Sequence, residues 1–315
     1  MLRRSVASGH VPHAYLFSGP EGVGKKAAAV ALASALNCSA RAEGEGEGCG
    51  ECPDCLHVAS SSHANVTVYA PEGGVIKIEL VRDLAERLRF KVDRGMKVVV
   101  VDDAHSLNPA AANAFLKTLE EPPPDSVIVL VTSRASALLP TMLSRCQRIN
   151  FRPLSESVLK GVLAERGAGA DEASAAARLG CGSVARALVY LDSDGQEKRK
   201  EAVGILASLA GSDVPEILDA AERLSKRDDL EEVLEFFKAW FRDRAVTLEG
   251  SPGLAVNTDV PGASAAGGGA DFEALWDSYT ECERARFETT PPRYGNKQLL
   301  METLLMRLVE NGGLA

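Results

Sequence analysis

The sequence has no hydrophobic run long enough to cross a membrane. Its longest aliphatic runs are VVVV at 98–101 and VIVLV at 127–131, whereas a membrane-spanning helix needs about 20 apolar residues. The N-terminal stretch MLRRSVASGH carries basic residues but no apolar segment of signal-peptide length. These absences exclude a membrane span and favour a cytoplasmic location.

The chain has fewer basic than acidic residues, and its aromatic side chains are few. The 315 residues carry a formal net charge of −9, and only 5% of them are aromatic. A protein that coats nucleic acid by itself needs a basic surface to neutralise phosphates. The acidic balance therefore argues against a zinc-dependent nucleic-acid-binding protein that acts alone, but it is compatible with a subunit of a larger DNA-handling machine.

The order of the expected elements divides the chain into an α/β part and a helical part. Aliphatic strands are expected at 14–18, 66–70, within 97–107 and at 126–133, and they alternate with helices over about the first 150 residues. This alternation is typical of a parallel sheet covered on both faces. Asn108 and Pro109 suit the N-cap and first position of one of these helices.

Helical patterns dominate from residue 154 onwards, so we expect two helical units after the α/β domain. The segment 249–271, rich in Gly, Ala, Pro and Ser, interrupts these patterns. Its composition predicts a loop too flexible to pack.

The segment SGPEGVGKK has the frame of a phosphate-binding loop. Gly19, Gly22 and Gly24 would let backbone N–H groups wrap phosphates, and Lys25 would supply positive charge to them. A strand before the loop and a helix after it are the context that such a loop needs. Lys26 stands where a Ser or Thr hydroxyl would bind Mg²⁺, so the residues leave two readings open, a nucleotide site and a glycine turn kept for packing.

Two carboxylates end the strand in VVVVDDAH. Asp102 would lie beside the metal ion of a nucleotide site. Asp103 takes the position where a competent ATPase often has a Glu that activates water, and its side chain is one methylene shorter. The alternative is an acidic strand end that is simply solvated.

Four of the seven cysteines are bunched after the helix that follows the glycine loop. Cys49, Cys52 and Cys55 follow one another at C-x-x-C spacing, and Cys38 precedes them. Two such steps let a tight turn point three thiolates at one centre, and Cys38 would complete a tetrahedron. Four soft ligands predict a structural Zn²⁺ site with no open position for catalysis, and an iron–sulfur cluster is the alternative.

The runs HAYLFSGPEGVGKK, VVVVDDAHSLNPAAANAFLKTLEEPP and VTSRASALLPTMLSRCQRINF, together with the cysteines, resemble the clamp-loader subunits of bacterial DNA polymerase III, a branch of the AAA+ proteins. The motif-bearing part covers about residues 10–153. The resemblance implies a P-loop AAA+ domain at 1–152 with a zinc module at 38–55, a helical lid at 153–197 and a helical collar at 198–315.

The resemblance also implies partners and site residues. Such subunits form a hetero-pentamer, with gamma/tau and delta subunits, that opens the sliding clamp and places it on primed DNA. Taken alone, Arg145 would be a surface ion pair. Within the Ser144-Arg145-Cys146 motif it matches the arginine finger that reaches into a neighbouring ATP site. Thr132 and Arg186 match the positions of two nucleotide sensors.

Three departures separate this sequence from the ATPase subunits that the resemblance covers. Lys26 replaces a hydroxyl, Asp103 replaces a Glu, and the first strand lies too near the N-terminus for a segment that would grip adenine. They favour a stator, which offers its arginine and hydrolyses little or no ATP, with ATP and Mg²⁺ left open as ligands. The alternative is an active motor of the gamma/tau type.

Overall fold

The protein, described here by a computed structural model for residues 1–42, 44–90, 94–257, 269–289 and 295–314, divides into two compact units. The first unit comprises Met1–Ser155 and Gly182–Ala185, and the second comprises Glu156–Cys181 and Arg186–Ala315. The expected change from α/β to helical structure lies close to the boundary at residue 155. The finer division of the helical part into a lid and a collar stays a prediction.

The first unit contains a five-stranded sheet in which all neighbouring strands are parallel. The strands are β1 (Ala14–Ser18), β2 (Val66–Tyr69), β3 (Lys97–Val101), β4 (Ser126–Thr132) and β5 (Gln147–Asn150). Their order is β2-β3-β4-β1-β5. The first four confirm the expected strands. The sequence did not predict β5, because the mostly exposed residues QRIN contain no aliphatic run.

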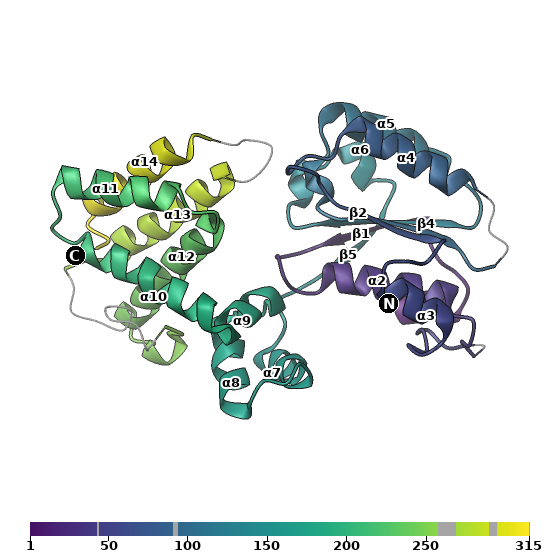
Figure 1. Ribbon diagram of the computed structural model, residues 1–315, viewed down its shortest axis with the longest axis horizontal. Coiled ribbons are helices and arrows are strands. Elements are labelled where there is room, and N and C mark those ends of the chain that lie inside the picture. Colours follow the sequence, from purple (N-terminus) through teal and green to yellow (C-terminus); the bar gives the residue numbers. More distant parts are fainter. Residues whose placement is uncertain (43, 91–93, 258–268, 290–294, 315) are drawn as a thin grey trace. The chain divides into compact units, whose positions relative to one another are not determined.

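Helices cover both faces of this sheet (Figure 1). On one face lie α4 (Ile78–Arg89), α5 (Pro109–Glu120) and α6 (Pro140–Leu143), and on the other lie α1 (Leu2–Ala7), α2 (Lys25–Asn37) and α3 (Pro53–Ala59). Asn108 caps α5 as expected, because its side chain accepts a hydrogen bond of 2.8 Å from the backbone N–H of Ala111.

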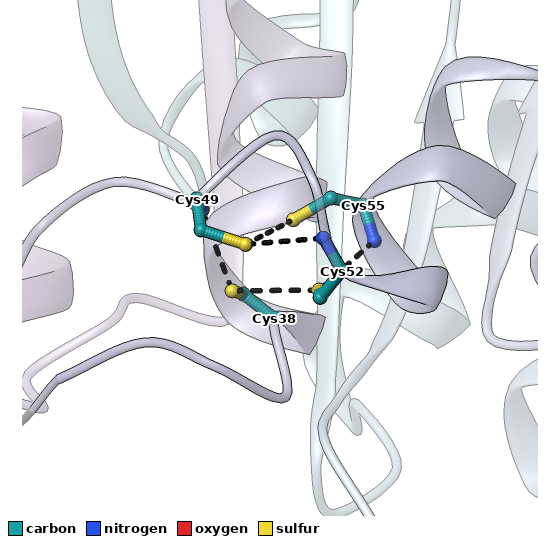
Figure 2. Close-up of side chains that lie close together, drawn as sticks. All are labelled: Cys38, Cys49, Cys52 and Cys55. Atoms are coloured by element: carbon teal, nitrogen blue, oxygen red, sulfur yellow. Dashed lines mark hydrogen bonds between the residues drawn. The ribbon is translucent and has the colours of Figure 1, made fainter.

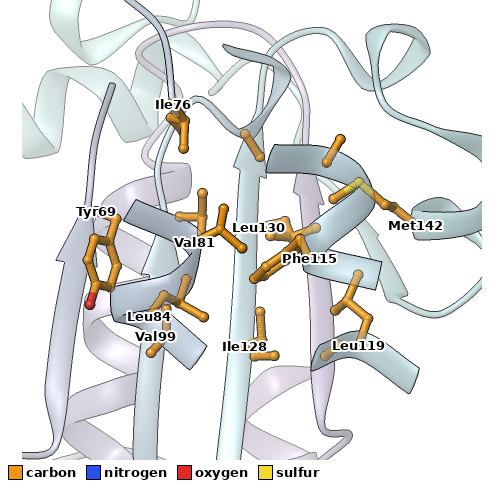
Figure 3. Packing of buried hydrophobic residues seen from close by; sticks show 14 of the residues in the cluster. Tyr69, Ile76, Val81, Leu84, Val99, Phe115, Leu119, Ile128, Leu130 and Met142 are labelled. Atoms are coloured by element: carbon orange, nitrogen blue, oxygen red, sulfur yellow. The ribbon is translucent and has the colours of Figure 1, made fainter. Parts of the chain in front are cut away.

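Alternation along the strands divides the apolar side chains between two cores. Val99 of β3 and Ile128 of β4 face α4 and α5, whereas Val98 and Val127 face the opposite layer with α2. Figure 3 shows Ile128 and its neighbours packed beneath Phe115 of α5. Burial of each such side chain stabilises the fold by about 1.5–3 kcal/mol. The two cores together therefore fix the strands, and with them the residues at the strand ends.

The second unit is helical throughout the residues that the structure describes. Its helices are α7 (Glu156–Glu165), α8 (Ala170–Leu179), α9 (Val184–Leu191, which begins in the first unit), α10 (Ser193–Ser208), α11 (Val214–Ser225), α12 (Leu230–Leu248), α13 (Phe272–Thr289) and α14 (Lys297–Glu310). Helix α12 packs against α10 and α13, and α14 packs against α11 and α13. No described helix has both the length and the apolar character needed to cross a membrane.

Part of the segment expected to be too flexible to pack is ordered, contrary to that expectation. Residues Pro252–Leu254 form a 3-10 turn, and Asn257 is buried. The backbone N–H and the side-chain amide of Asn257 both donate to Asp243 Oδ2 at 2.7 Å. These bonds anchor the start of the segment to α12, whereas residues 258–268 lie outside the described part of the chain.

Candidate functional site

Three segments that the sequence singled out meet at the carboxyl edge of the sheet. The glycine loop follows β1, Asp102 follows β3, and Thr132 is the last residue of β4. Strand β4 lies between β1 and β3, and Ser18 pairs in register with Thr132. Parallel strands end at the same edge of a sheet, where ligands bind in open α/β folds.

Packing within the first unit explains two of the loop glycines. A Cβ at Gly19 would lie 2.3 Å from the carbonyl oxygen of Phe151, and a Cβ at Gly22 would lie 2.1 Å from Ser183 Oγ. Gly22 also accepts a hydrogen bond of 2.8 Å from the backbone N–H of Val184. Gly24 has open space around it and a φ of 91°, and it caps the N-terminus of α2. The first two glycines are thus required even without a ligand.

Lys25 is buried in the loop itself. Its Nζ donates to the carbonyl oxygens of Gly19 at 2.7 Å and Pro20 at 2.6 Å. Burial lowers the pKa of Lys25, an effect that the carboxylates of Glu21, Asp103 and Asp102 oppose. The ammonium therefore braces the loop from inside, with carboxylates from β3 and the loop around it.

Lys26, the next residue, forms an ion pair with the first carboxylate after β3. Its Nζ lies 3.0 Å from Asp102 Oδ2, and the two side chains are 54% and 19% exposed. The other oxygen, Asp102 Oδ1, accepts a hydrogen bond of 3.2 Å from the backbone N–H of Asp103. The position expected to hold a Mg²⁺ ligand is therefore occupied by a positive charge of the chain.

Asp103 and His105 follow Asp102 in a turn at the strand end. Asp103 adopts a left-handed conformation with a φ of 46°, which Asp tolerates better than most residues. Burial, and then the neighbouring Asp102, raise the pKa of its carboxyl. His105 Nδ1 lies 3.2 Å from Thr132 Oγ1. Burial lowers the pKa of His105 to about 4, so the ring is neutral at physiological pH.

Thr132 is fully buried between these groups. Its Oγ1 accepts a hydrogen bond of 3.0 Å from the backbone N–H of Arg134, in addition to its contact with His105. The sequence reasoning missed His105 and Arg134. The signal was present, because both follow the ends of expected strands, where polar side chains reach the sheet edge.

Arg145 lies where α6 ends and β5 begins. Its Nη2 is 2.6 Å from Glu120 Oε1 at the end of α5, and its Nη1 donates to the carbonyl oxygen of Thr141 at 2.9 Å. The hydroxyl of Ser144 also donates to Thr141, at 3.0 Å. The side chain of Arg145 is 34% exposed. The guanidinium is thus held at the surface by the Glu120 carboxylate, the Thr141 carbonyl group and a longer hydrogen bond of 3.5 Å to Ser144 Oγ.

Arg186 belongs to the helical unit. It lies on α9, and its Nη1 is 3.4 Å from Glu235 Oε2 on α12. This ion pair joins Arg186 to a carboxylate of the same helical unit. The role of Arg186 as a nucleotide sensor stays a prediction.

The predicted cysteine ligands converge on one point (Figure 2). The sulfur atoms of Cys38, Cys49, Cys52 and Cys55 all lie within 4.8 Å of one another. Cys38 Sγ is 3.8 Å from Cys52 Sγ, and Cys49 Sγ is 4.0 Å from Cys55 Sγ. Ligand atoms of a tetrahedral site with bonds of about 2.3 Å lie about 3.8 Å apart. The four cysteines therefore form a cage of a size that fits a metal ion.

Local hydrogen bonds shape this cysteine cage. The backbone N–H groups of Cys49, Cys52 and Cys55 donate to the sulfur atoms of Cys38, Cys49 and Cys52 at 3.3–3.4 Å. Hydrogen bonds, first that from Ser39, lower the pKa of Cys52 to about 5, whereas burial raises the pKa of Cys55 to about 11. Cys38 ends α2 and Cys52 caps α3. His57, two residues after Cys55, is exposed and is not part of the cage.

The first unit is similar to known protein subunits. Residues 1–155 match the protein family described as DNA polymerase III, delta subunit. The delta' subunit of DNA polymerase III from Bacillus subtilis is 33% identical over 167 residues, which are 53% of this chain and 50% of that protein. The tau subunit from the same organism is 36% identical over 163 residues, which are 51% of this chain and 28% of that protein.

A third relative supports the same relationship. The delta' subunit from Pseudomonas aeruginosa is 42% identical over 140 residues, or 42% of this chain and 41% of that protein. The chain thus spans half or less of the length of these relatives. A solved gamma-subunit-related protein from Thermotoga maritima aligns over 98% of both chains with 19% identity and a TM-score of 0.48, too low to carry an argument about the fold. The expected resemblance to DNA polymerase III subunits is confirmed.

Proposed function

Because the chain is a relative of the delta' and tau subunits of DNA polymerase III, we propose that it is a delta-prime-type subunit of a bacterial clamp loader, with an AAA+ domain in its first unit. In this role it is a stator, which supplies Arg145 to the ATP site of a neighbouring subunit and hydrolyses little or no ATP itself. The observation that carries the proposal is the 3.0 Å ion pair between Lys26 and Asp102.

This ion pair supports a stator because hydrolysis at a P-loop needs a metal ion. Mg²⁺ bridges the β- and γ-phosphate oxygens and neutralises the charge that develops on them, and it is held by the hydroxyl after the P-loop lysine and by a strand-end carboxylate. Here the first ligand is replaced by Lys26, whose ammonium contacts the second. Asp103, one methylene shorter than Glu, holds its carboxylate farther from an attacking water.

The setting of Arg145 supports its proposed action on a neighbouring subunit. An arginine finger has to leave its resting partner and reach a phosphate of another chain. The partner, Glu120, is 49% exposed and Arg145 is 34% exposed. Ion pairs with this exposure contribute about 0–1 kcal/mol, so the guanidinium can exchange Glu120 for a phosphate at low cost. Ser144 would shape the turn that presents it.

The remaining parts of the proposal concern the metal and the assembly. We assign Zn²⁺ to the cysteine cage, since four thiolates suit a closed structural site, and an iron–sulfur cluster is the alternative. The partners would be gamma/tau and delta subunits in a hetero-pentamer, with the sliding clamp and primed DNA contacted through the complex. Residues 153–197 would form the lid and 198–315 the collar that joins the ring.

The test is ATP turnover by the assembled complex. The chain is combined with gamma/tau and delta subunits, and DNA-stimulated hydrolysis is measured with the wild type and with Arg145→Ala. We expect the variant to assemble normally and to lower turnover on the order of 10³-fold, as removal of an arginine finger does. Arg148→Ala, an exposed arginine three residues further on, is the matched control and should leave turnover unchanged.

Other outcomes would favour the rival functions. Unchanged turnover with Arg145→Ala removes this residue from the mechanism. Substantial Mg²⁺-dependent hydrolysis by the isolated chain, abolished by Lys25→Ala, would identify an active motor of the gamma/tau type. Tight, salt-sensitive DNA binding by the isolated chain would favour a protein that acts on nucleic acid alone.

A further inference from the structure

The site at the carboxyl edge of the sheet does not fit the Mg²⁺ ion that its family resemblance implies. Mg²⁺ requires six oxygen ligands in a near-octahedral arrangement at about 2.0–2.1 Å. Of the two protein oxygens that a P-loop normally provides, one is replaced by the ammonium of Lys26, and the other, on Asp102, is 3.0 Å from that ammonium. A divalent cation at Asp102 would have to displace Lys26 and then lie beside its positive charge.

The ammonium of Lys26 has the means to bind phosphate in place of the metal. An ammonium group has three N–H donors and no acceptor. One donor is directed to Asp102, which leaves two for oxygens of another group. Lys26 lies in the first turn of α2, directly after Lys25, and its side chain is 54% exposed. An incoming phosphate can therefore reach the charge without any rearrangement of the core.

The charges around this edge are balanced without an added ion. The positive groups are Lys25, Lys26 and Arg134, and the carboxylates are those of Glu21, Asp102 and Asp103. In a metal-dependent P-loop the strand-end carboxylate would attract the cation from solution. Here Lys26 already neutralises Asp102 and adds hydrogen-bond donors at the mouth of the glycine loop, beside the N-terminus of α2.

We propose that Lys26 replaces Mg²⁺ as the phosphate-binding cation of this P-loop, so that the chain binds ADP equally well with and without a divalent metal. The ammonium holds Asp102 with one N–H and the terminal phosphate with the other two, while the backbone N–H groups of the loop, braced by Lys25, hold the remaining oxygens. This role concerns the nucleotide of the chain itself and does not depend on the action of Arg145 in a neighbouring subunit.

Equilibrium binding of a fluorescent ADP derivative to the isolated full-length chain tests the proposal. Titrations are compared at millimolar Mg²⁺ and in buffer freed of divalent ions by a cation-exchange resin. A soluble chelator is avoided because it would also strip the cysteine cage. We expect the two Kd values to agree within about twofold. A Kd weakened tenfold or more without Mg²⁺, or no binding in either buffer, would overturn the proposal.

Two substitutions of the same residue separate its charge from its position. Lys26→Met keeps the length of the side chain and removes the charge, and we expect it to weaken ADP binding about tenfold or more in both buffers, as loss of hydrogen bonds from a charged donor does. Lys26→Thr restores the missing hydroxyl, and its binding should become stronger with Mg²⁺ than without. Unchanged binding by Lys26→Met, or a Lys26→Thr variant that ignores Mg²⁺, would contradict the assignment.

A matched control guards against a general effect of lost surface charge. Lys160 also lies on a helix in a partly exposed ion pair, 2.9 Å from Glu156, and Lys160→Met should leave the Kd unchanged in both buffers. Circular dichroism of each variant shows whether it is folded. Because the readout is ADP binding by the isolated chain, its failure is distinct from failure of Arg145 to stimulate turnover in the complex.

Discussion

The cysteine cage and the carboxyl edge of the sheet are both arranged around positive charge, but they obtain it differently. In the cage, four sulfur atoms within 4.8 Å of one another surround a point that a metal ion from solution would fill. At the sheet edge, the charge beside Asp102 is the ammonium of Lys26, 3.0 Å away. One site has the geometry to take a metal ion from solution, and the other has a cation of the chain beside its carboxylate.

The difference between the two sites comes down to a single residue, Lys26 at the sheet edge. The cage keeps every ligand of its motif, so the motif and the geometry agree. The sheet edge keeps the glycine loop, Lys25 and Asp102, and it departs at Lys26. That one departure puts a charged group, in contact with Asp102, where a P-loop has a hydroxyl, and we propose that it changes which ion the same edge accepts. The two sites should therefore respond in opposite ways to loss of metal.

The largest effect is expected at the cage. Cys52→Ser removes one thiolate but preserves the N-cap of α3, because Ser is itself a preferred capping residue and the cap accepts the N–H of Cys55. Structural zinc contributes about 10–16 kcal/mol in small zinc-dependent folds. In this larger unit we expect a loss of about 3 kcal/mol, a fall in Tm of roughly 6–12 °C. Metal analysis should show one zinc per wild-type chain and less in the variant.

The control for this prediction is an exposed cysteine outside the cage. Cys181→Ser should retain the zinc and the wild-type Tm. Wild-type protein purified without chelator and found to hold no metal would defeat the cage assignment. Equal Tm values for Cys52→Ser and the wild type would show that the first unit does not need a metal ion in the cage for its stability.

Local sequence patterns predicted most of the first unit and the whole cage. The valine run of β3 and the cap at Asn108 depend on neighbouring residues, and the structure confirms both. The cage was predictable for the same reason, since C-x-x-C steps fix sulfur positions through local turns. Strand β5 was missed because its edge residues QRIN form a strand only by pairing with distant β1.

Contacts between distant segments account for the rest. The sequence showed that Lys26 cannot ligate Mg²⁺, but only the fold shows that its ammonium contacts Asp102. His105 and Thr132 likewise meet because β3 and β4 are neighbours. The composition of 249–271 predicted a loop, yet Asn257 is fixed by Asp243, a specific pairing that composition does not encode.

A smaller loss of stability is expected when the pH falls, because His105 at the sheet edge is buried and its protonated form is disfavoured in the folded protein. Burial lowers the pKa of His105 to about 4, and Arg134 acts in the same direction. The unfolded chain, with a histidine pKa of about 6.5, then binds more protons than the folded chain between these values. Protonation therefore favours unfolding, by about 2 kcal/mol between pH 7 and pH 5.

Denaturant unfolding at both pH values measures this effect. His105→Gln should lose about 2 kcal/mol less stability than the wild type on acidification, whereas His57→Gln, at an exposed position, should behave like the wild type. Loss of metal from the cage at low pH affects all three proteins and cancels in the difference. If His105→Gln and the wild type lose equal stability, His105 is not held neutral by burial at the sheet edge.

The smallest effect should follow removal of the built-in cation itself. Lys26 and Asp102 are 54% and 19% exposed, and ion pairs near the surface contribute about 0–1 kcal/mol. Lys26→Met should therefore lower the Tm by no more than roughly 2–4 °C, although we expect it to change which ions the site accepts. Lys25→Met is the matched comparison. It leaves the carbonyl groups of Gly19 and Pro20, in a partly buried loop, without hydrogen bonds from a charged donor, at a cost of about 1–3 kcal/mol. A Lys26→Met variant as unstable as Cys52→Ser would mean that the sheet edge, like the cage, needs its cation in order to fold.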